Sequence, residues 1–265
     1  MKHPPAFSDF ELAWTYHRNS SRWAHNAEET SGADDVPEPG AEAPSRPFQP
    51  LPAPPRVTTG LSDVLANRCS CREFAQDPIS LETVSGILFH GYGVWGQDHW
   101  NTAEFLERPV PSGGGMYPLE LYLVSRNTSG LSNGIYHYQP LLKGLERNRD
   151  LTLPAPLMRY LFMGQYPPML APALIVITSR MSRSLKKYGD RGYRYVLLEA
   201  GHVAQNINLA CTGLGAQSLN IGGFFDDEVG ALCHCPENEE VVLYAVAIGH
   251  GTSEDRHKLR FSEDT

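Results

Sequence analysis

The sequence has no long apolar run, few cysteines and no excess of basic charge. No stretch of the 265 residues approaches the roughly 18 apolar residues of a spanning helix. The N-terminal residues, M-K-H-P-P-A-F-S-D-F, contain no apolar segment typical of a secretory signal. The formal net charge of −8 argues against a nucleic-acid or anionic membrane partner. We therefore expect a cytoplasmic protein.

The five cysteines do not suggest a disulfide framework. Cys69 and Cys71 form one C-x-C pair, Cys233 and Cys235 form another, and Cys211 stands alone. An odd count in a reducing compartment argues against paired cystines. Structural zinc sites usually have two to four residues between paired cysteines, so we expect no metal and interpret these residues as small buried or loop thiols.

The length fits a single α+β domain preceded by an N-terminal arm. Aromatic residues and a leucine in residues 9–25 indicate a short amphipathic helix. Residues 26–55 are acidic and rich in proline, a composition that does not bury enough surface to order itself. We therefore divide the chain into an arm, residues 1–58, and a folded domain, residues 59–265.

Hydrophobic periodicity predicts a mixture of helices and strands without regular alternation, which indicates an α+β fold. Ser80 is a candidate N-cap for a helix in which Val84, Ile87, Leu88 and Gly91 share one face. The longest helical pattern covers residues 190–212, with Asp190 as its cap, and is apolar enough to be buried. The remaining predicted elements are strands at 119–125, 134–138, 173–179 and 241–248 and a short helix at 158–164.

Arg68, Ser70 and Arg72 alternate along one short segment. An extended backbone would place the two guanidinium groups and the hydroxyl on one side, which suits a phosphate or a polyol. The alternative is an ordinary pair of surface arginines.

Residues 111–118 read P-S-G-G-G-M-Y-P and lead directly into a predicted strand. Ser112 offers a hydroxyl, and the glycines expose N–H groups with no Cβ in the way, so the backbone can approach a planar ring or an oxyanion. The alternative is a tight turn, which needs one glycine rather than three.

Three further features carry weaker signals. Lys187 can stabilise the phenolate of Tyr188, so the pair can move a proton near neutral pH, although most such dipeptides are solvated. Polar residues on the longest helix, among them Glu199, either contact a ligand or form internal hydrogen bonds at a packed helix or dimer seam. Gly222 and Gly223 form either a second close-approach loop or a simple turn.

Taken in order, these segments resemble the nitroreductase superfamily of FMN enzymes, and within it the SagB-type dehydrogenases that include azoline oxidases. The resemblance covers about Arg56 to Gly249. The patterns that carry it are P-S-x-G-x-x-Y-P-L-E at residues 111–120 and Y-G-D-R-G-Y-R-Y-x-L-L-E-A-G-H-x-A-Q-N at residues 188–206, together with the R-x-S-x-R segment of the wider superfamily.

The resemblance implies an α+β homodimer in which a central mixed or antiparallel sheet is flanked by helices and FMN lies at the subunit interface. Arg68, Ser70 and Arg72 would hold the phosphate and ribityl chain. The other residues implied to bind or adjoin the cofactor are Pro111, Ser112, Gly113 and Gly114, from the other subunit, and Glu199, Gly201, Gly222 and Gly223. On this interpretation the triple glycine lets the backbone lie against the isoalloxazine ring.

The resemblance also implies a phosphate-binding basic residue after the last strand, where this chain has Gly249-His250-Gly251. His250, Arg256 and Lys258 are the candidates to replace it. Lys187 and Tyr188 match the proton-transfer pair of azoline oxidases. The implied reaction removes a Cα proton and a Cβ hydride from a thiazoline or oxazoline in a ribosomal or carrier-protein-bound peptide.

The same resemblance leaves other functions and partners open. One alternative is the reduction of nitro compounds or quinones by NAD(P)H, or the desaturation of a cyclic dipeptide, at the same flavin site. Another is a non-catalytic subunit that scaffolds a cyclodehydratase complex. A cyclodehydratase or synthetase is in any case an expected partner.

Overall fold

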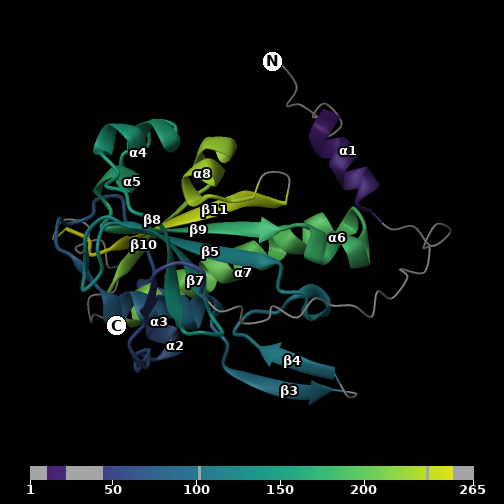
Figure 1. The fold of residues 1–265 in the computed structure, drawn as a ribbon, viewed down its shortest axis with the longest axis horizontal. Coiled ribbons are helices and arrows are strands. Elements are labelled where there is room, and N and C mark those ends of the chain that lie inside the picture. Colours follow the sequence, from purple (N-terminus) through teal and green to yellow (C-terminus); the bar gives the residue numbers. More distant parts are fainter. Residues whose placement is uncertain (1–10, 22–43, 101–102, 237–238, 253–265) are drawn as a thin grey trace, which may run out of the picture.

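The computed structural model describes residues 11–21, 44–100, 103–236 and 239–252. Its centre is a seven-stranded sheet in the order β1-β8-β7-β5-β9-β11-β10, in which every neighbouring pair is antiparallel (Figure 1). The strands are β1 (Phe48–Pro50), β5 (Leu119–Ser125), β7 (Gly134–Gln139), β8 (Gly144–Arg149), β9 (Ala173–Arg180), β10 (Gln217–Ile221) and β11 (Glu240–Gly249). All four predicted strands are confirmed within two residues at each end.

The central strands are apolar throughout because helices cover both faces of the sheet. In β5, Leu121 and Leu123 belong to one buried cluster, whereas Tyr122 and Val124 belong to another. Side chains alternate across a strand, so each cluster lies on its own face. The continuous apolar sequence of β9 has the same origin.

One face is covered by α3 (Leu81–Tyr92) and α7 (Arg191–Gly213), and the other by α4 (Ala155–Leu161), α5 (Pro167–Leu170) and α8 (Asp226–Cys233) (Figure 1). The predicted cap of α3 is confirmed, because Ser80 Oγ accepts a hydrogen bond from the Thr83 N–H at 3.0 Å. The helix ends at Tyr92, with Gly93 as the residue directly after it.

The remaining elements lie at the ends of the sheet. They are α2 (Leu61–Asn67), α6 (Ser182–Tyr188), the parallel pair β2 (Ile79–Ser80) and β6 (Thr128–Ser129), and the hairpin β3 (Gly96–Trp100) and β4 (Ala103–Glu107). Of the described residues, none belongs to a helix that is both long enough and apolar enough to span a bilayer.

The predicted N-terminal helix is present as α1 (Glu11–Asn19), and it contacts the start of α7. Arg191 donates a hydrogen bond to the Ser20 carbonyl at 2.8 Å, and the Tyr16 and Tyr193 rings meet edge to face. Most of the predicted acidic arm lies outside the described residues. Its last part includes β1, which pairs with β8, so the sheet already contains residues before Thr59. The division at residues 58 and 59 stays an expectation.

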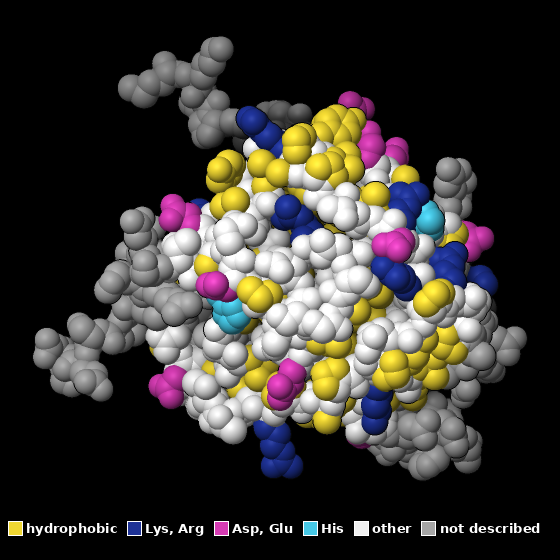
Figure 2. Space-filling view, turned by 60° about the vertical axis from the view of Figure 1, so that its left-hand side comes forward, with side chains coloured by type: hydrophobic (Ala, Val, Ile, Leu, Met, Phe, Trp, Pro, Cys, Tyr) yellow, Lys and Arg dark blue, Asp and Glu magenta, His cyan; other side chains and the backbone are white. Residues whose placement is uncertain are grey.

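The longest predicted helix is confirmed as α7, but two details were wrong. Asp190 makes no capping hydrogen bond through its side chain. The helix is also not buried all round, because Tyr193, Leu197 and Leu198 are exposed. A second exposed apolar group, Tyr160, Met163 and Tyr166, lies on and after α4. Figure 2 shows hydrophobic side chains gathered at the top of the molecule, where Figure 1 places α4. Apolar surface of this kind marks contact sites.

Candidate active site

The triple-glycine segment, Gly113–Gly115, forms a single 3-10 turn at the start of β5. Gly114 has φ +63°, which glycine adopts without steric cost. A Cβ at Gly114 would overlap the hydroxyl of Tyr188 and would lie 3.0 Å from Lys187 Nζ. A Cβ at Gly113 would lie 3.3 Å from the Tyr195 ring. Within the chain, the Lys187–Tyr188 pair is therefore what lies against the glycine backbone, and the predicted approach to a planar ring or an oxyanion stays a prediction.

Lys187 and Tyr188 end α6, directly before Gly189 at φ +55°. Lys187 Nζ lies 5.7 Å from the centroid of the Tyr188 ring. The Tyr188 ring meets the Tyr195 ring edge to face, with centroids 5.0 Å apart. Tyr188 is therefore held between the glycine turn and the second turn of α7.

Glu199 connects α7 to the glycine loop through a hydrogen bond with Ser112. Ser112 Oγ donates a hydrogen bond to Glu199 Oε2 at 2.5 Å and accepts one from the Tyr117 N–H at 2.9 Å. Tyr92 donates to Glu199 Oε1 at 3.2 Å. Burial raises the pKa of Glu199 to about 7, although the Ser112 and Tyr92 hydrogen bonds and the Arg108 charge oppose the rise.

Arg108 lies between two aromatic rings of this network. Its guanidinium carbon is 4.3 Å from the centroid of the Tyr92 ring and 4.9 Å from that of Tyr117. It also donates to the Tyr92 carbonyl at 3.0 Å. Such stacking contributes about 0.5–2 kcal/mol per ring. Tyr92, Arg108 and Tyr117 come from separate segments that only the fold brings together, so no local sequence pattern indicates them.

A buried ion-pair network lies beneath the loop, at the start of β5. Glu120 contacts Arg183 at 2.7 Å, His137 at 2.8 Å and Arg180 at 3.5 Å. Burial acts to raise the pKa of Glu120, but the His137 hydrogen bond and the arginine charges outweigh it and lower the pKa to about 2. Arg183 also donates to the Tyr117 carbonyl at 3.2 Å. The network therefore fixes the C-terminal end of the glycine loop.

The arginine segment lies elsewhere in the same chain. Arg68 follows α2, and the next residues run beside the edge of β10, where the Cys71 N–H donates to the Ser218 carbonyl at 2.9 Å. Arg68 and Ser70 are half-buried, and Arg72 is exposed. The Ala75 N–H donates to the His250 carbonyl at 2.7 Å, which brings one of the three candidate phosphate-binding basic residues beside this segment. Arg256 and Lys258 lie outside the described residues.

The glycine loop and the arginine segment adjoin different parts of α7. Ser112 of the loop contacts Glu199, whereas Ser218, the partner of Ser70 on β10, donates to Asn208 Oδ1 at 2.9 Å. Glu199 and Asn208 are 9 positions apart in the helix, which corresponds to about 14 Å. One chain therefore does not bring Ser112 and Arg68 together.

The other predicted glycines have different surroundings. Gly222 and Gly223 follow β10, and a Cβ at Gly223 would lie 2.9 Å from Gln165 Nε2, which donates to the Gly223 carbonyl at 2.6 Å. The contact with Gln165 therefore favours glycine at position 223 even without a ligand. Gly201 lies on the exposed face of α7, and a Cβ there would meet no described atom within 4 Å. Pro111 is exposed at the start of the loop.

The residues around β10 fit the polar part of FMN. The side-chain oxygens of Gln217 and Asn220 are buried and have no hydrogen-bond donor among the described residues. The ribityl hydroxyls and the ring imide of FMN are donors of the kind that these oxygens lack. Arg68, Ser70 and Arg72 are the side chains suited to its phosphate.

We expect the buried Glu199 carboxyl to make stability fall as pH rises. Its pKa is about 7 in the folded chain and 4.5 ordinarily. The folded state therefore binds more protons than the unfolded state between pH 4.5 and 7, and the free energy of unfolding declines through that window by up to about 3 kcal/mol. Urea unfolding midpoints at several pH values measure this decline.

The Glu199→Gln variant should lack that decline, because its amide does not titrate. The Glu82→Gln variant is the matched control, since Glu82 is exposed on α3, and it should keep the decline. Parallel curves for the wild type and Glu199→Gln would contradict the assignment.

Comparison with known proteins shows related sequences and a shared fold. A family model described as the nitroreductase family matches residues 65–250. The protein MJ1384 of Methanocaldococcus jannaschii, named as a nitroreductase, is 37% identical over 175 residues, which cover 64% of this chain and 81% of that protein.

Two further comparisons are with proteins of the Escherichia coli microcin system. The microcin B17-processing protein McbC of Escherichia coli is 34% identical over 129 residues, which cover 47% of each protein. The chain thus spans less than half the length of that relative. The E. coli microcin synthetase McbBCD complex, with truncated pro-MccB17 bound, contains a chain that is 22% identical to this one, with a TM-score of 0.60 and coverage of 95% of this chain and all of that one.

Proposed function

The chain belongs to the nitroreductase family, and on that basis we propose that it is an FMN-dependent dehydrogenase that oxidises thiazoline or oxazoline rings in a peptide. The observation that carries the proposal is the contact of Lys187 and Tyr188 with Gly114, because it puts a proton-transfer pair against the loop expected to face the cofactor. The likeness to McbC, a peptide-processing protein, favours a peptide natural product as substrate.

In the proposed site, a second copy of the chain completes the cofactor pocket. Arg68, Ser70 and Arg72 of one copy hold the phosphate, and residues 111–114 of the other adjoin the ring. Two observations support this arrangement: the roughly 14 Å along α7 between the two groups in one chain, and the exposed side chains of Leu197 and Leu198 on α7, which a partner would cover. Bound FMN would supply the two-electron oxidation chemistry.

The chain itself would position the substrate and accept its proton. Tyr188, assisted by the charge of Lys187, takes the Cα proton of the azoline ring. The Ser112–Glu199 hydrogen bond and the Arg108 stack hold the glycine loop, so the distance from Tyr188 to the loop is kept constant. Glu199 and Gly201 lie on the helix at the proposed seam.

A reductase is the second candidate, because the more similar relative, MJ1384, is named as a nitroreductase. In that case the same site would accept a nitro compound or quinone with NAD(P)H as donor. The partner proposed for the oxidase, a cyclodehydratase or synthetase, would then have no role.

One pair of measurements tests the proposal. The purified protein should be yellow, and it should convert an azoline peptide into a product lighter by two hydrogen atoms. Incubation with NADPH and a nitroarene is the comparison reaction. Rapid nitroarene turnover without azoline oxidation would favour the reductase, and colourless protein that takes up no FMN would contradict both.

A further inference from the structure

One end of β11 has an open edge. β9 pairs with β11 from Glu240 onward, but β10 pairs with it only from Ala245 to Gly249. Among the described residues, no other backbone group bonds to Val241–Tyr244 from the side away from β9. Alternate residues of a strand direct their N–H and C=O groups to opposite sides, so about half of this stretch offers unpaired donors and acceptors.

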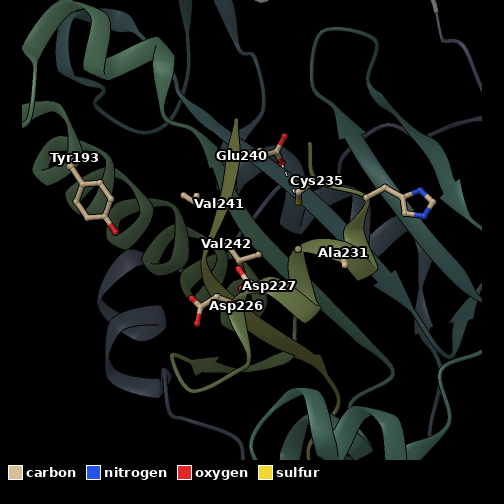
Figure 3. A pocket seen from close by; sticks show the side chains of 10 residues that line it. Tyr193, Asp226, Asp227, Ala231, Cys235, Glu240, Val241 and Val242 are labelled. Carbon is tan, nitrogen blue, oxygen red and sulfur yellow. Dashed lines mark hydrogen bonds between the residues drawn. The ribbon is translucent and has the colours of Figure 1, made fainter. Parts of the chain in front are cut away.

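The open edge lines a cleft of about 910 Å³ that the candidate active site does not use. Its walls are the start of α8, with Asp226 and Asp227, and Tyr193 of α7 (Figure 3). Val241 and Val242 project from β11 between these walls. The strand therefore has room beside it for another extended segment.

The sequence of the edge, E-V-V-L-Y, favours strand formation and contains neither lysine nor proline, the residues that most directly protect a free edge. The pairing of β11 with β9 has a register shift between Val242 and Tyr244, and the only charged residue of the edge, Glu240, is buried against Thr178 and Arg180. Val241 is 39% exposed. An open strand edge that includes two valines and offers unpaired backbone groups matches surfaces that bind peptides by adding a strand.

The edge lies at the same end of the sheet as the proton-transfer pair. Glu240 pairs in register with Arg180, the last residue of β9, which leads directly into α6 with Lys187 and Tyr188. Arg180 and Arg183 contact Glu120 beneath the glycine loop. A peptide on this edge would therefore point toward the loop.

The charged residues around the cleft favour a peptide that carries a basic side chain. Asp226 and Asp227 are exposed in the first turn of α8. The other titratable groups that line the cleft are Tyr193, His234, Cys235 and Glu240. The Glu240 carboxylate is already paired with Arg180, so the two aspartates remain for a basic side chain.

We propose that residues 240–244 of β11 bind the peptide substrate as an added strand, with a basic side chain of the peptide beside Asp226 and Asp227. This inference rests on the proposed function only in naming the peptide as the substrate. The bound peptide would lie beyond the end of β10, past Gly222 and Gly223, and would pair with the part of β11 that β10 does not reach.

The test uses three labelled peptides and fluorescence anisotropy with the purified full chain. The first is Gly-Thr-Val-Arg-Val-Thr-Gly, the second has Glu in place of Arg, and the third is N-methylated at alternate amides, prepared in both registers. We expect the second peptide to bind about tenfold more weakly than the first, because it loses the charge pair with Asp226 and Asp227. One register of the third peptide should also bind about tenfold more weakly than the first, because it loses one or two backbone hydrogen bonds.

Variants of the chain test the same surface. Val241→Lys should weaken binding of the first peptide about tenfold, because the added cation repels its arginine. Leu65→Lys, on exposed α2, is the matched control and should bind normally. The peptide-side substitutions keep the test valid even when a variant folds poorly.

The outcomes are distinct. Equal binding of all peptides, or no binding, overturns the inference. Dissociation of a dimer by Val241→Lys in sedimentation would assign the edge to a second copy instead. Selective binding without azoline oxidation overturns the proposed function alone, whereas azoline oxidation with affinity insensitive to N-methylation and to Val241→Lys overturns this inference alone.

Discussion

The Lys187→Ala, Tyr188→Phe double variant is expected to lose azoline oxidation by a factor of about 100 or more while the protein stays yellow. A positioned acid–base group contributes about 10²–10⁴-fold to a reaction rate. The structure gives the reason for the choice, since Lys187 Nζ and the Tyr188 hydroxyl both lie against Gly114. The double variant leaves Arg68, Ser70 and Arg72, the proposed phosphate site, unchanged, so the colour should remain.

Turnover of an azoline peptide, followed by mass spectrometry, and the visible absorption spectrum measure the two effects. Lys186→Ala combined with Tyr166→Phe is the matched control, because both side chains are exposed and Tyr166 lies after α4. That variant should keep full turnover. An active Lys187→Ala, Tyr188→Phe enzyme would remove the pair from the mechanism.

The Gly114→Ala variant is expected to lose nearly as much activity through a single methyl group. Its Cβ would overlap the Tyr188 hydroxyl, and the side chain must move away. Misplacing a reacting group by about 1 Å can cost on the order of 100-fold in rate. The variant also places a Cβ at φ +63°, which costs about 1–2 kcal/mol of stability.

Gly130→Ala separates these two costs. Gly130 also has positive φ, at +83°, but the nearest atom to its Cβ is in Leu81 at 3.7 Å, an ordinary contact. Thermal unfolding should show a similar loss of stability in both variants, whereas only Gly114→Ala should lose azoline oxidation. Equal activity in the two variants would show that the position of Tyr188 does not depend on Gly114.

The predicted elements that were confirmed had either a continuous apolar run or a long helical pattern in their sequence. The run from Ala173 to Ser179 was apolar on both faces, and the sheet does bury both of its faces there. The 190–212 pattern predicted α7 within one residue at each end. The short strand β10 and the outer strand β1 were missed, because pairing with neighbours defines them more than their own composition does.

The candidate site was predictable only where its residues were adjacent in sequence. The glycine loop and the Lys187–Tyr188 pair stood out separately, but nothing in the sequence indicated that Gly114 and Tyr188 touch. Tyr92 and Arg108 reach Glu199 from distant segments, so no local pattern marks them. The exposed side of α7 was not expected, because the apolar composition of a helix does not show which of its faces the chain itself covers.

The 23 residues of α7 make the spacing between its two ends a property of helix geometry rather than of loops. Each residue turns the helix by about 100° and lengthens it by about 1.5 Å. A single-residue insertion or deletion between Tyr195 and Asn208 would rotate the side chains at one end of the helix by about 100° relative to those at the other end. Most substitutions on the exposed face would leave the positions of both ends unchanged. Length variation in related chains should therefore be absent from this interval and confined to segments such as the β3–β4 hairpin.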